Sequence, residues 1–510
     1  MATLGTNSIH ADLRAALPTM STLQRIGDGL LVRTQAYIDG TWVPADDGST
    51  FAVINPANDE ILANVANLGV TETMAAVAAA DAALPAWRAR TGKDRAAVLR
   101  RWFDLMTAHA QDLAAIMTAE QGKPLPEALG EVAYGASFVE WFAEEAKRVT
   151  GDVLASPSTD KRMMVFRQPI GVCAAITPWN FPIAMITRKA APALAAGCTI
   201  VIKPAGQTPL CALALAELAH RAGIPRGVIN VVTTKTASSA IGKALCDSPV
   251  VRHISFTGST PVGAILMQQS APTVKKLALE LGGHAPFIVF DDVDIDAAVE
   301  GAIASKYRNA GQTCVCTNRF YVQDKVYDTF VARLAEKAAG LRVGNGFEPG
   351  VAQGPLIDDQ AVDKVREHIE DALSKGAALV TGGDVLVGHG SSRFVAPTVL
   401  ADASHDMLIA TEETFGPVAA VFRFRDEAEV IAMANGTESG LASYFYSGDV
   451  SRVWRVAEAL EYGMVGINTG LISNEVAPFG GVKQSGLGRE GSRYGIDEYL
   501  EMKYVCLGGM

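Results

Sequence analysis

The sequence lacks several features that would place a chain of 510 residues in a specialised class. It contains no run of about 18 or more apolar residues, the length that crosses a bilayer, so no membrane span is predicted. It carries 44 basic residues against 55 acidic ones, whereas a duplex nucleic-acid binder normally has a basic face. We therefore expect neither a membrane nor a nucleic acid as a partner.

Cysteine is scarce, and its seven copies form no CxxC pair. A secreted disulfide framework normally has an even number of cysteines at regular spacing, so the pattern favours a cytoplasmic protein. Cys314 and Cys316 stand one residue apart, but no second Cys or His pair at ligand spacing accompanies them. That absence argues against zinc or another bound metal.

The hydrophobic periodicity predicts alternating elements along most of the chain. Apolar and polar residues alternate over "AYIDGTWVP" and "STFAVINPAND", which is typical of hairpins. A helical period follows over residues 71–89, 94–120 and 127–150. From "MMVFRQPIGVCAAITP" onward, strand and helix patterns repeat with short loops, and a second such series runs from about residue 295 to 461. Such alternation indicates parallel, doubly wound sheets, so we predict an α/β fold with two lobes.

The stretch "RNAGQTCVCTNR" places Cys314 in a turn just before a strand-like segment. Reactive groups are commonly presented on loops at the ends of strands. A thiol is the most nucleophilic side chain near neutral pH, provided that its thiolate is favoured locally. Cys314 is therefore a candidate nucleophile, and a buried structural cysteine is the alternative.

Two further stretches contain candidate partners for a nucleophile. In "TPWNFP", two prolines fix a turn around Asn180, whose amide could donate to a developing oxyanion or simply cap its own backbone. In "LELGGHAPFIVF", Glu280 stands among apolar residues, which would raise its pKa toward that of a useful general base. The alternative for Glu280 is a solvent-facing residue at the end of a helix.

A third region suggests nucleotide binding. Lys203 in "IKPAGQTPL" follows a buried strand, at the edge where α/β proteins bind nucleotides. The turn "FTGSTPVG", with Ser259, could direct backbone amides at a phosphate. The turn is not a GxGxxG motif, so taken alone it is weak support.

Taken together, "PWNFP", "LELGG", "GQTC", "EETFGP" and "PFGGVKQSGLGREGS" resemble the aldehyde dehydrogenase superfamily, in the family's order, over residues 33–510. Longer stretches such as "KYRNAGQTCVCTNR" are similar to the bacterial succinate-semialdehyde dehydrogenases. The resemblance implies the aldehyde dehydrogenase fold, with an N-terminal extension (1–32), a Rossmann-like cofactor domain (33–150 and 170–285), an α/β catalytic domain (286–485) and a small β oligomerisation arm (151–169 and 486–510). The extension could be a weak organellar transit peptide, or a docked or disordered segment.

The resemblance also implies a role for each matching residue. Cys314 would attack the aldehyde, Asn180 and the Cys314 amide would form the oxyanion hole, and Glu280 would activate the water that releases the acid. The expected cofactor-binding residues are Trp179, Lys203, Gly206, Ser259, Glu413 and Phe415.

The expected substrate is succinate semialdehyde, a small acidic aldehyde. By resemblance, Arg188, Arg308 and Ser473 would hold its carboxylate, and arginine suits this because its planar fork can bind both oxygens. Glutarate semialdehyde is the close alternative, since one methylene usually discriminates only about 10–200-fold. A Cys-dependent acyltransferase or esterase is a more distant alternative, and the presence of Glu280 favours hydrolysis of a thioester instead.

The preferred cofactor follows from one departure. NAD-preferring relatives often carry a Glu three residues after the lysine, where this chain has Gly206, so nothing there would repel a 2′-phosphate. We expect NADP to be preferred, with use of NAD as the alternative. Cys316 is a candidate for a reversible disulfide with Cys314, or a bystander thiol. We also expect a homo-oligomer, a dimer or a tetramer, because a strand at the chain end commonly pairs with another subunit.

Overall fold

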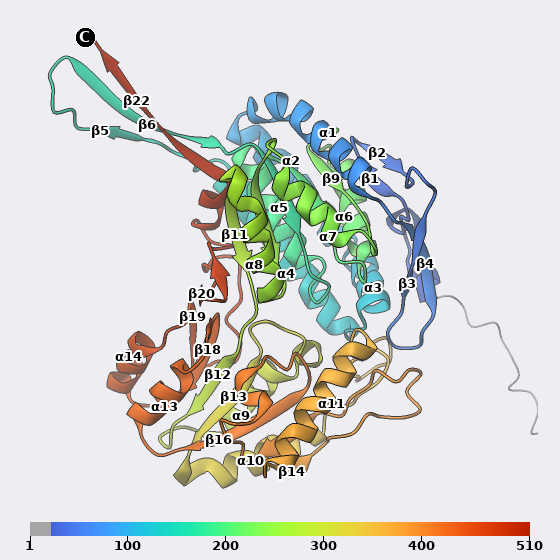
Figure 1. Ribbon diagram of the computed structural model, residues 1–510, viewed down its shortest axis with the longest axis vertical. Coiled ribbons are helices and arrows are strands. Elements are labelled where there is room, and N and C mark those ends of the chain that lie inside the picture. The colour runs from blue at the N-terminus through green and yellow to red at the C-terminus, as the bar shows by residue number, and fades with distance from the viewer. Residues whose placement is uncertain (1–21, 510) are drawn as a thin grey trace, which may run out of the picture.

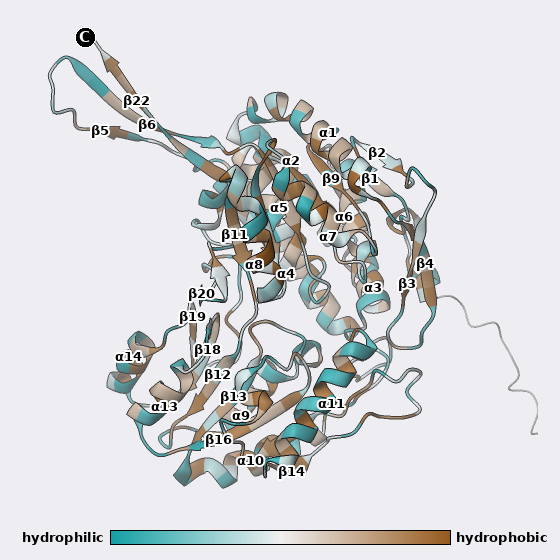
Figure 2. Ribbon diagram, viewed as in Figure 1, coloured by the Kyte–Doolittle hydropathy of each residue, from teal (hydrophilic) through white to brown (hydrophobic). Residues whose placement is uncertain are grey.

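The computed structural model describes residues 22–509, which form two α/β lobes and a projecting arm (Figure 1). In the view of Figure 1, the upper lobe contains most of the first half of the chain, the lower lobe contains most of the second half, and the arm extends from the upper lobe. Hydrophobic residues gather on the strands inside each lobe, whereas α11 (Asp359–Ser374), on the outside of the lower lobe, is largely hydrophilic (Figure 2). Each lobe therefore has its own core.

The upper lobe is built on a mixed sheet. Within residues 22–509 its strands are, in order across the sheet, β2 (Thr41–Val43), β1 (Ala36–Ile38), β9 (Ile229–Val231), β8 (Thr199–Lys203), β7 (Val172–Ile176), β10 (Val251–Thr257), β11 (Lys276–Glu280) and β21 (Gly486–Leu487). The five strands from β9 to β11 are mutually parallel, and the outer ones are antiparallel. The parallel strands consist mainly of buried Val, Ile and Ala, as expected for a sheet covered on both faces.

Helices cover both faces of this sheet. One face packs against α2 (Gly92–Ala108), α3 (Ala110–Gln121), α4 (Leu125–Glu145), α5 (Ala184–Ala196) and α6 (Pro209–Arg221). The other face packs against α1 (Val70–Arg88), α7 (Ser238–Asp247) and α8 (Thr260–Ser270). A separate hairpin, β3 (Thr50–Ile54) and β4 (Ile61–Ala66), lies at the side of the lobe (Figure 1).

The lower lobe repeats this layered design. In the described chain its sheet has the order β14 (Ala378–Thr381), β15 (Thr398–Ala401), β16 (Val418–Phe424), β13 (Thr317–Gln323), β12 (Ala285–Val289), β18 (Ala442–Tyr446) and β19 (Met464–Ile467), and only β14 is antiparallel to its neighbour. One face packs against α9 (Ile295–Lys306) and α10 (Asp324–Ala339). The other packs against α11 (Asp359–Ser374), α12 (Leu408–Thr411), α13 (Glu427–Asn435) and α14 (Val450–Ala459). The predicted α/β class and doubly wound topology are confirmed in both lobes.

The arm is an antiparallel sheet of β5 (Asp152–Leu154), β6 (Lys161–Pro169) and β22 (Leu500–Gly508), standing away from both lobes (Figure 1). It leaves large apolar side chains in solvent, including Val153 and Met502, which are 84% and 75% exposed. The last strand of the arm, β22, begins at Leu500, whereas the predicted arm segment begins at residue 486. Residues 486–487 instead pair with β11, and a small ribbon of β17 (Ser439–Gly440) and β20 (Val482–Lys483) precedes them.

The structure differs from the periodicity in one helix and locates part of the extension. The helix predicted over 94–120 is two helices, because the backbone at His109 leaves the helical conformation between α2 and α3. Residues 1–21 of the predicted extension lie outside the described residues. Residues 22–32 dock on the upper lobe, where the Asp28 amide donates to Asp112 and Arg221 pairs with Asp28. No helix within residues 22–509 has both the length and the hydrophobicity needed to cross a bilayer.

Candidate functional site

The loop that carries Cys314 has an unusual backbone. Asn309, Ala310 and Gly311 have φ values of +51°, +56° and +75°, three left-handed residues in succession. Each non-glycine residue in this region costs about 1–2 kcal/mol, so other contacts must hold the loop. A side chain at Gly311 would also collide with the Gly416 carbonyl, 2.1 Å from its Cβ position. The Cys314 loop therefore packs directly against the "EETFGP" loop.

Asn309 is the main support of this loop. Its side-chain amide donates to the Asn180 carbonyl at 3.0 Å and to the Gln312 carbonyl at 3.1 Å. Its own backbone amide donates to Glu127, and its side-chain oxygen accepts from Gln121. These bonds are largely buried, where an unmade bond costs more than in water, and they offset the strain of the left-handed turn.

Asn180 is anchored from both ends of the residue. Its side-chain nitrogen donates to the Gln312 carbonyl at 3.0 Å, and the second hydrogen of that amide remains available. Its backbone carbonyl accepts from Lys123 at 2.8 Å, and Lys123 also pairs with Glu131. Glu131 in turn accepts from the Ile183 amide at the start of α5. A buried ion pair thus fixes the turn between β7 and α5 against the Cys314 loop.

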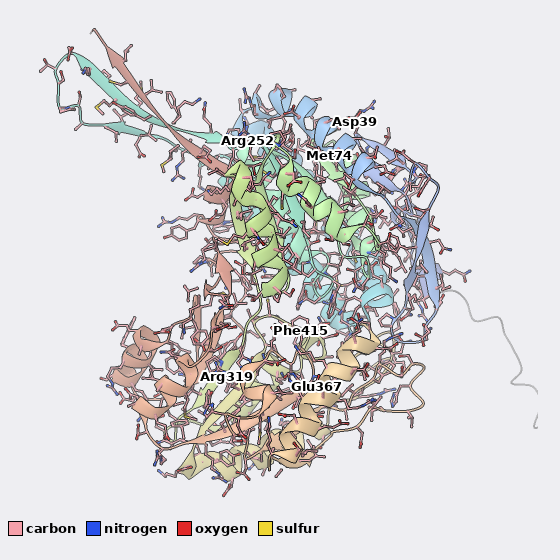
Figure 3. All side chains as sticks on the ribbon, in the orientation of Figure 1. Asp39, Met74, Arg252, Arg319, Glu367 and Phe415 are labelled. Carbon is pink, nitrogen blue, oxygen red and sulfur yellow. The ribbon has the colours of Figure 1, made fainter. Side chains whose placement is uncertain are left out.

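These loops enclose a cavity of about 280 Å³ between the lobes. Its lining includes six of the predicted residues, namely Trp179, Asn180, Ser259, Cys314, Glu413 and Phe415. Phe415 has a φ of +55° and meets Trp179 edge to face, with ring centroids 5.7 Å apart. Figure 3 shows Phe415 at the junction of the lobes, well above Arg319 in the lower lobe. The cavity unites candidates from four separate stretches of sequence.

Gly283 lets the Cys314 loop come close to the end of β11. A Cβ at position 283 would lie 2.3 Å from the Cys314 carbonyl oxygen, so only glycine fits there. The neighbouring Gly282 has Glu413 at 3.2 Å from its Cβ position, and the Gly283 amide donates to Glu413 at 3.4 Å. The pair of glycines in "LELGG" therefore brings the thiol loop, Glu413 and Glu280 into one neighbourhood.

Burial shifts the pKa values of Cys314 and Glu280, the two groups that would lose or accept a proton during catalysis. Burial and the charges of Glu413 and Glu280 raise the pKa of the Cys314 thiol to about 12, against the lowering effect of the charges of Arg188 and Arg308. Burial also raises the pKa of Glu280 well above its ordinary value, and Glu490 adds to the effect. Glu280 ends β11 and is buried, so the alternative of a solvent-facing helix end is wrong. The predicted rise of its pKa is confirmed.

The two predicted substrate arginines have different surroundings. Arg188 is fully buried on α5, where its Nη2 lies 2.6 Å from Glu490 and its guanidinium lies 3.8 Å from the centre of the Phe479 ring. Lys189 also pairs with Glu490 and donates to Thr257. Arg188 is thus already compensated by a carboxylate. Its Nε has no hydrogen-bond partner among the described residues.

Arg308 is the less compensated of the two. It is partly buried, lies 5.2 Å from the centre of the Phe181 ring and makes no ion pair within the described chain. Its charge lowers the pKa of Cys314, as the charge of Arg188 does. Ser473 is partly buried on the loop that precedes Phe479, the residue that stacks on Arg188. No direct bond joins Ser473 to either arginine in residues 22–509.

Two of the predicted cofactor-binding residues, Ser259 and Glu413, also border a larger cleft beside the cavity that contains Cys314. A cleft of about 730 Å³ is lined by Ser259, Gly282, Glu413 and other residues at the start of α8. Ser259 is the N-cap of α8 but its side chain caps no amide in the described chain, so amides at this helix end are available to a phosphate. Lys203 ends β8 and is buried, and this burial lowers its pKa to about 8. A buried lysine without a carboxylate partner in residues 22–509 suits an anionic group.

Cys316 is turned away from Cys314. The segment 314–316 is a turn, and the strand expected after Cys314 begins at Thr317 as β13. The Cys316 thiol donates to the Lys306 carbonyl at 3.4 Å, and both cysteines are free thiols. A turn brings two such residues closer than a strand does, so a disulfide between them stays a prediction.

Sequence reasoning missed the charged residues that support the site. Lys123, Glu131, Lys189 and Glu490 are buried within the described chain and form ion pairs around Asn180 and Arg188. Glu490 stands in "SGLGREGS", a stretch that contributes to the family resemblance but to which the resemblance assigned no role for Glu490. Lys189 and Glu490 are 301 positions apart, so no local pattern marks that pair. Lys123 and Glu131 are only eight positions apart, but nothing in their stretch indicates that both are buried.

The fold and this set of residues agree with comparisons to known proteins. The sequence profile described as "Aldehyde dehydrogenase family" matches residues 42–505. The chain belongs to the aldehyde dehydrogenase family, and it is an oxidoreductase of that family.

Close relatives are named for different substrates. The chain is 61% identical to the NADP-dependent succinate-semialdehyde dehydrogenase of Escherichia coli, over 95% of this chain and 100% of the relative. It is 63% identical to the glutarate-semialdehyde dehydrogenase of Pseudomonas putida, over 95% of this chain and 99% of the relative. The crystal structure of succinate-semialdehyde dehydrogenase from Burkholderia pseudomallei has a TM-score of 0.93 and 63% identity, covering 95% of this chain and 99% of that one.

Proposed function

We propose that the protein oxidises succinate semialdehyde to succinate, with NADP as the preferred cofactor. The observation that carries this proposal is the cavity of about 280 Å³, in which a thiol, an amide donor and an aromatic wall meet beside cationic side chains. The names of the close relatives support the same activity.

The proposed reaction begins with covalent capture of the aldehyde. Cys314, a thiol in the free protein, first loses its proton to solvent, and the resulting thiolate attacks the carbonyl carbon. The side-chain amide of Asn180 and the Cys314 backbone amide stabilise the oxyanion. A nicotinamide dinucleotide, when bound, supplies the acceptor for the hydride that leaves the carbon. The thiohemiacetal on Cys314 thereby becomes a thioester.

Hydrolysis of this thioester completes the reaction. Glu280, as a carboxylate, takes a proton from water, and the resulting hydroxide attacks the acyl carbon and releases the Cys314 thiol with the acid. The raised pKa of Glu280 suits this role because a stronger base removes the proton more readily. A lasting acyl-enzyme handed to another acceptor, as in an acyltransferase, would have no need of this base.

The substrate carboxylate would be bound by Arg308, with Arg188 and Ser473 completing the set. Arg308 is the better-placed partner because it forms no ion pair in residues 22–509, whereas Arg188 is paired with Glu490. The second candidate substrate is glutarate semialdehyde, which the 63% identical relative is named for. One added methylene is a small difference for such a site.

The proposed preference for NADP comes from the adenosine end of the site. Gly206 leaves open the position from which a Glu would repel a 2′-phosphate, and Lys203 is an uncompensated buried cation nearby in sequence. The name of the Escherichia coli relative supports the same preference. A kcat/KM for NAD well above that for NADP would overturn it.

The test is absorbance at 340 nm with purified enzyme, NADP or NAD, and three aldehydes: succinate semialdehyde, glutarate semialdehyde and butanal. We expect succinate semialdehyde to give the highest kcat/KM, and Arg308→Gln to lower that value for both acidic aldehydes but not for butanal. Equal kcat/KM values for butanal and the semialdehydes in the unmodified enzyme would contradict recognition of a carboxylate.

A further inference from the structure

A cleft of about 440 Å³ adjoins Gly206, outside the cavity that contains Cys314. Gly206, Gln207 and Lys235 line it on the upper-lobe side, and residues 357–360 at the start of α11 line it from the lower lobe. Lys203 lies three residues before Gly206, at the end of β8. The cleft thus opens at the end of the site where the adenosine of a dinucleotide would lie under the proposed function.

Lys235 lies directly beside Gly206 on the upper-lobe side of this cleft. A Cβ built on Gly206 would lie 3.0 Å from the Thr234 carbonyl, 3.3 Å from the Lys235 Cα and 3.4 Å from the Lys235 Cβ. Any acidic side chain at position 206 would therefore start within contact distance of Lys235 and could pair with it. Because residue 206 is glycine, both the space and the Lys235 charge remain available.

The loop that carries Lys235 is fixed in place. The side-chain oxygen of Asn67 accepts from the backbone amide of Lys235 at 3.0 Å and from the Thr234 hydroxyl at 3.2 Å. The side-chain nitrogen of Asn67 donates to the Thr236 hydroxyl at 2.8 Å. One asparagine side chain thus bonds to three successive residues, so the backbone of Lys235 is positioned before any ligand arrives.

The acidic groups of the cleft are already engaged, and the lysines are not. Glu120 accepts from the first amides of α6, and Asp358 caps α11. Asp359 lies 3.1 Å from Arg393. Neither Lys203 nor Lys235 has a carboxylate within ion-pair distance in the part of the chain described. Lys235 therefore lines the open space beside Gly206 without a carboxylate partner, and Lys203 is a second such lysine at the end of β8, three residues before Gly206.

We propose that Lys235 binds the 2′-phosphate of NADP, together with Lys203, across the space that Gly206 leaves open. This inference rests on the proposed function for the presence of a dinucleotide, but it concerns a residue that the family resemblance did not mark. A phosphate dianion between two ammonium groups replaces two unpaired charges by charge-assisted bonds. Lys235 is then a specificity-determining residue, because NAD has no 2′-phosphate to offer it.

The test is binding of 2′,5′-ADP and 5′-ADP to the full-length enzyme by isothermal titration calorimetry, without any turnover. We expect Lys235→Gln to weaken 2′,5′-ADP about tenfold, since a bond to a charged group contributes about 1.4 kcal/mol or more, and to leave 5′-ADP within twofold. Lys243→Gln is the matched control, because Lys243 is an exposed lysine on α7 that pairs with Asp247. It removes the same charge from the same lobe and should change neither affinity.

A second variant uses the geometry at position 206. Gly206→Glu should weaken 2′,5′-ADP more strongly in the unmodified background than in Lys235→Gln, because part of its effect is pairing with Lys235. Equal losses in both backgrounds, or an unchanged 2′,5′-ADP affinity in Lys235→Gln, would overturn the role of Lys235.

The outcome also separates this inference from the proposed function. Tight, Lys235-dependent binding of 2′,5′-ADP without oxidation of any semialdehyde would refute the substrate and keep Lys235. Semialdehyde oxidation with NADP at a rate and NADP affinity that Lys235→Gln does not change would refute the role of Lys235 and keep the proposed substrate. An enzyme that binds 2′,5′-ADP no better than 5′-ADP would refute both the NADP preference and Lys235.

Discussion

The two ends of the proposed dinucleotide site are built in opposite ways. At the chemical end, Cys314 and Asn180 lie on loops that are buried and held by several side-chain bonds. At the adenosine end, Lys235 borders an open space beside Gly206, Lys203 is buried at the end of β8, and neither has an ion pair in residues 22–509. Bonds within the protein fix the groups of the chemical end in position, whereas the two lysines of the adenosine end have no carboxylate partner within residues 22–509.

This difference separates rate from affinity. Reacting groups must be held in a defined geometry before the substrate arrives, so the chemical end is overdetermined and its substitutions should act mainly on kcat. A cation without a partner in the protein contributes to the free energy of binding when it forms a charge-assisted bond to an anion of the ligand. Substitutions at the adenosine end should therefore act mainly on the KM and Kd of the cofactor. The following experiments would break or sharpen this division.

The largest effect is expected from removing the nucleophile. Cys314→Ser should lower kcat by roughly 10⁴-fold or more, because a hydroxyl is a much weaker nucleophile than a thiolate. The Kd of 2′,5′-ADP should stay within twofold. Steady-state kinetics and calorimetry measure the two quantities, and a Cys314→Ser enzyme with a kcat near that of the unmodified protein would refute the thioester route.

Removing the base should stall the enzyme after its first half-reaction. Glu280→Gln keeps the size of the side chain but cannot accept a proton, so hydrolysis should slow by about 10²–10⁴-fold. We expect a burst of one reduced cofactor per active site, followed by a slow steady rate, in stopped-flow absorbance at 340 nm. Absence of the burst, with an unchanged steady rate, would remove Glu280 from the mechanism.

The oxyanion donor should contribute somewhat less. Asn180→Ala should lower kcat by about 10²–10³-fold, equivalent to roughly 3–4 kcal/mol of transition-state stabilisation. The protein should stay folded, because the Asn180 backbone carbonyl still accepts from Lys123 and Asn309. Thermal unfolding serves as the control for the kinetics, and a folded variant with an unchanged kcat would contradict the proposed role.

At the adenosine end, pH should act on affinity. Burial lowers the pKa of Lys203 to about 8 in the free protein, so this lysine is mostly charged at pH 7 and mostly neutral at pH 9. A bound phosphate favours the charged form, and affinity for 2′,5′-ADP should therefore fall about tenfold from pH 7 to pH 9. Proton uptake on binding near pH 8, measured by calorimetry in two buffers, checks the sign. The Lys203→Met variant should lose this dependence.

The smallest effect on the site is expected from the arm. Val153 and Met502 are exposed there, so Val153→Asp with Met502→Asp should disturb an interface between subunits without unfolding either lobe. We expect light scattering to show a smaller assembly than the dimer or tetramer of the unmodified protein. Val387→Asp is the control, since Val387 is 92% exposed on a lower-lobe loop. An unchanged mass for the arm variant would refute the arm as the interface.

Sequence reasoning succeeded where the signal was local. The alternation of strands and helices, the burial of Glu280 among leucines and the turn around Asn180 all depend on neighbours in the chain. It was less exact where a short turn delays an element, because the strand expected after Cys314 begins only at Thr317. It also missed the helix break at His109, which the apolar period crosses without a change.

The sequence by itself determined the α/β class and the absence of an acidic residue at position 206, and it predicted a nucleophile and its partners. Only the tertiary structure decided which charges are compensated. Within residues 22–509, Arg188 is paired and Arg308 is not, Lys123 supports Asn180, and Lys235 lies beside Gly206 without an ion pair. The reason is that an ion pair depends on proximity in space, and Lys189 and Glu490 meet across 301 positions of sequence. No local pattern of residue types records such a distance.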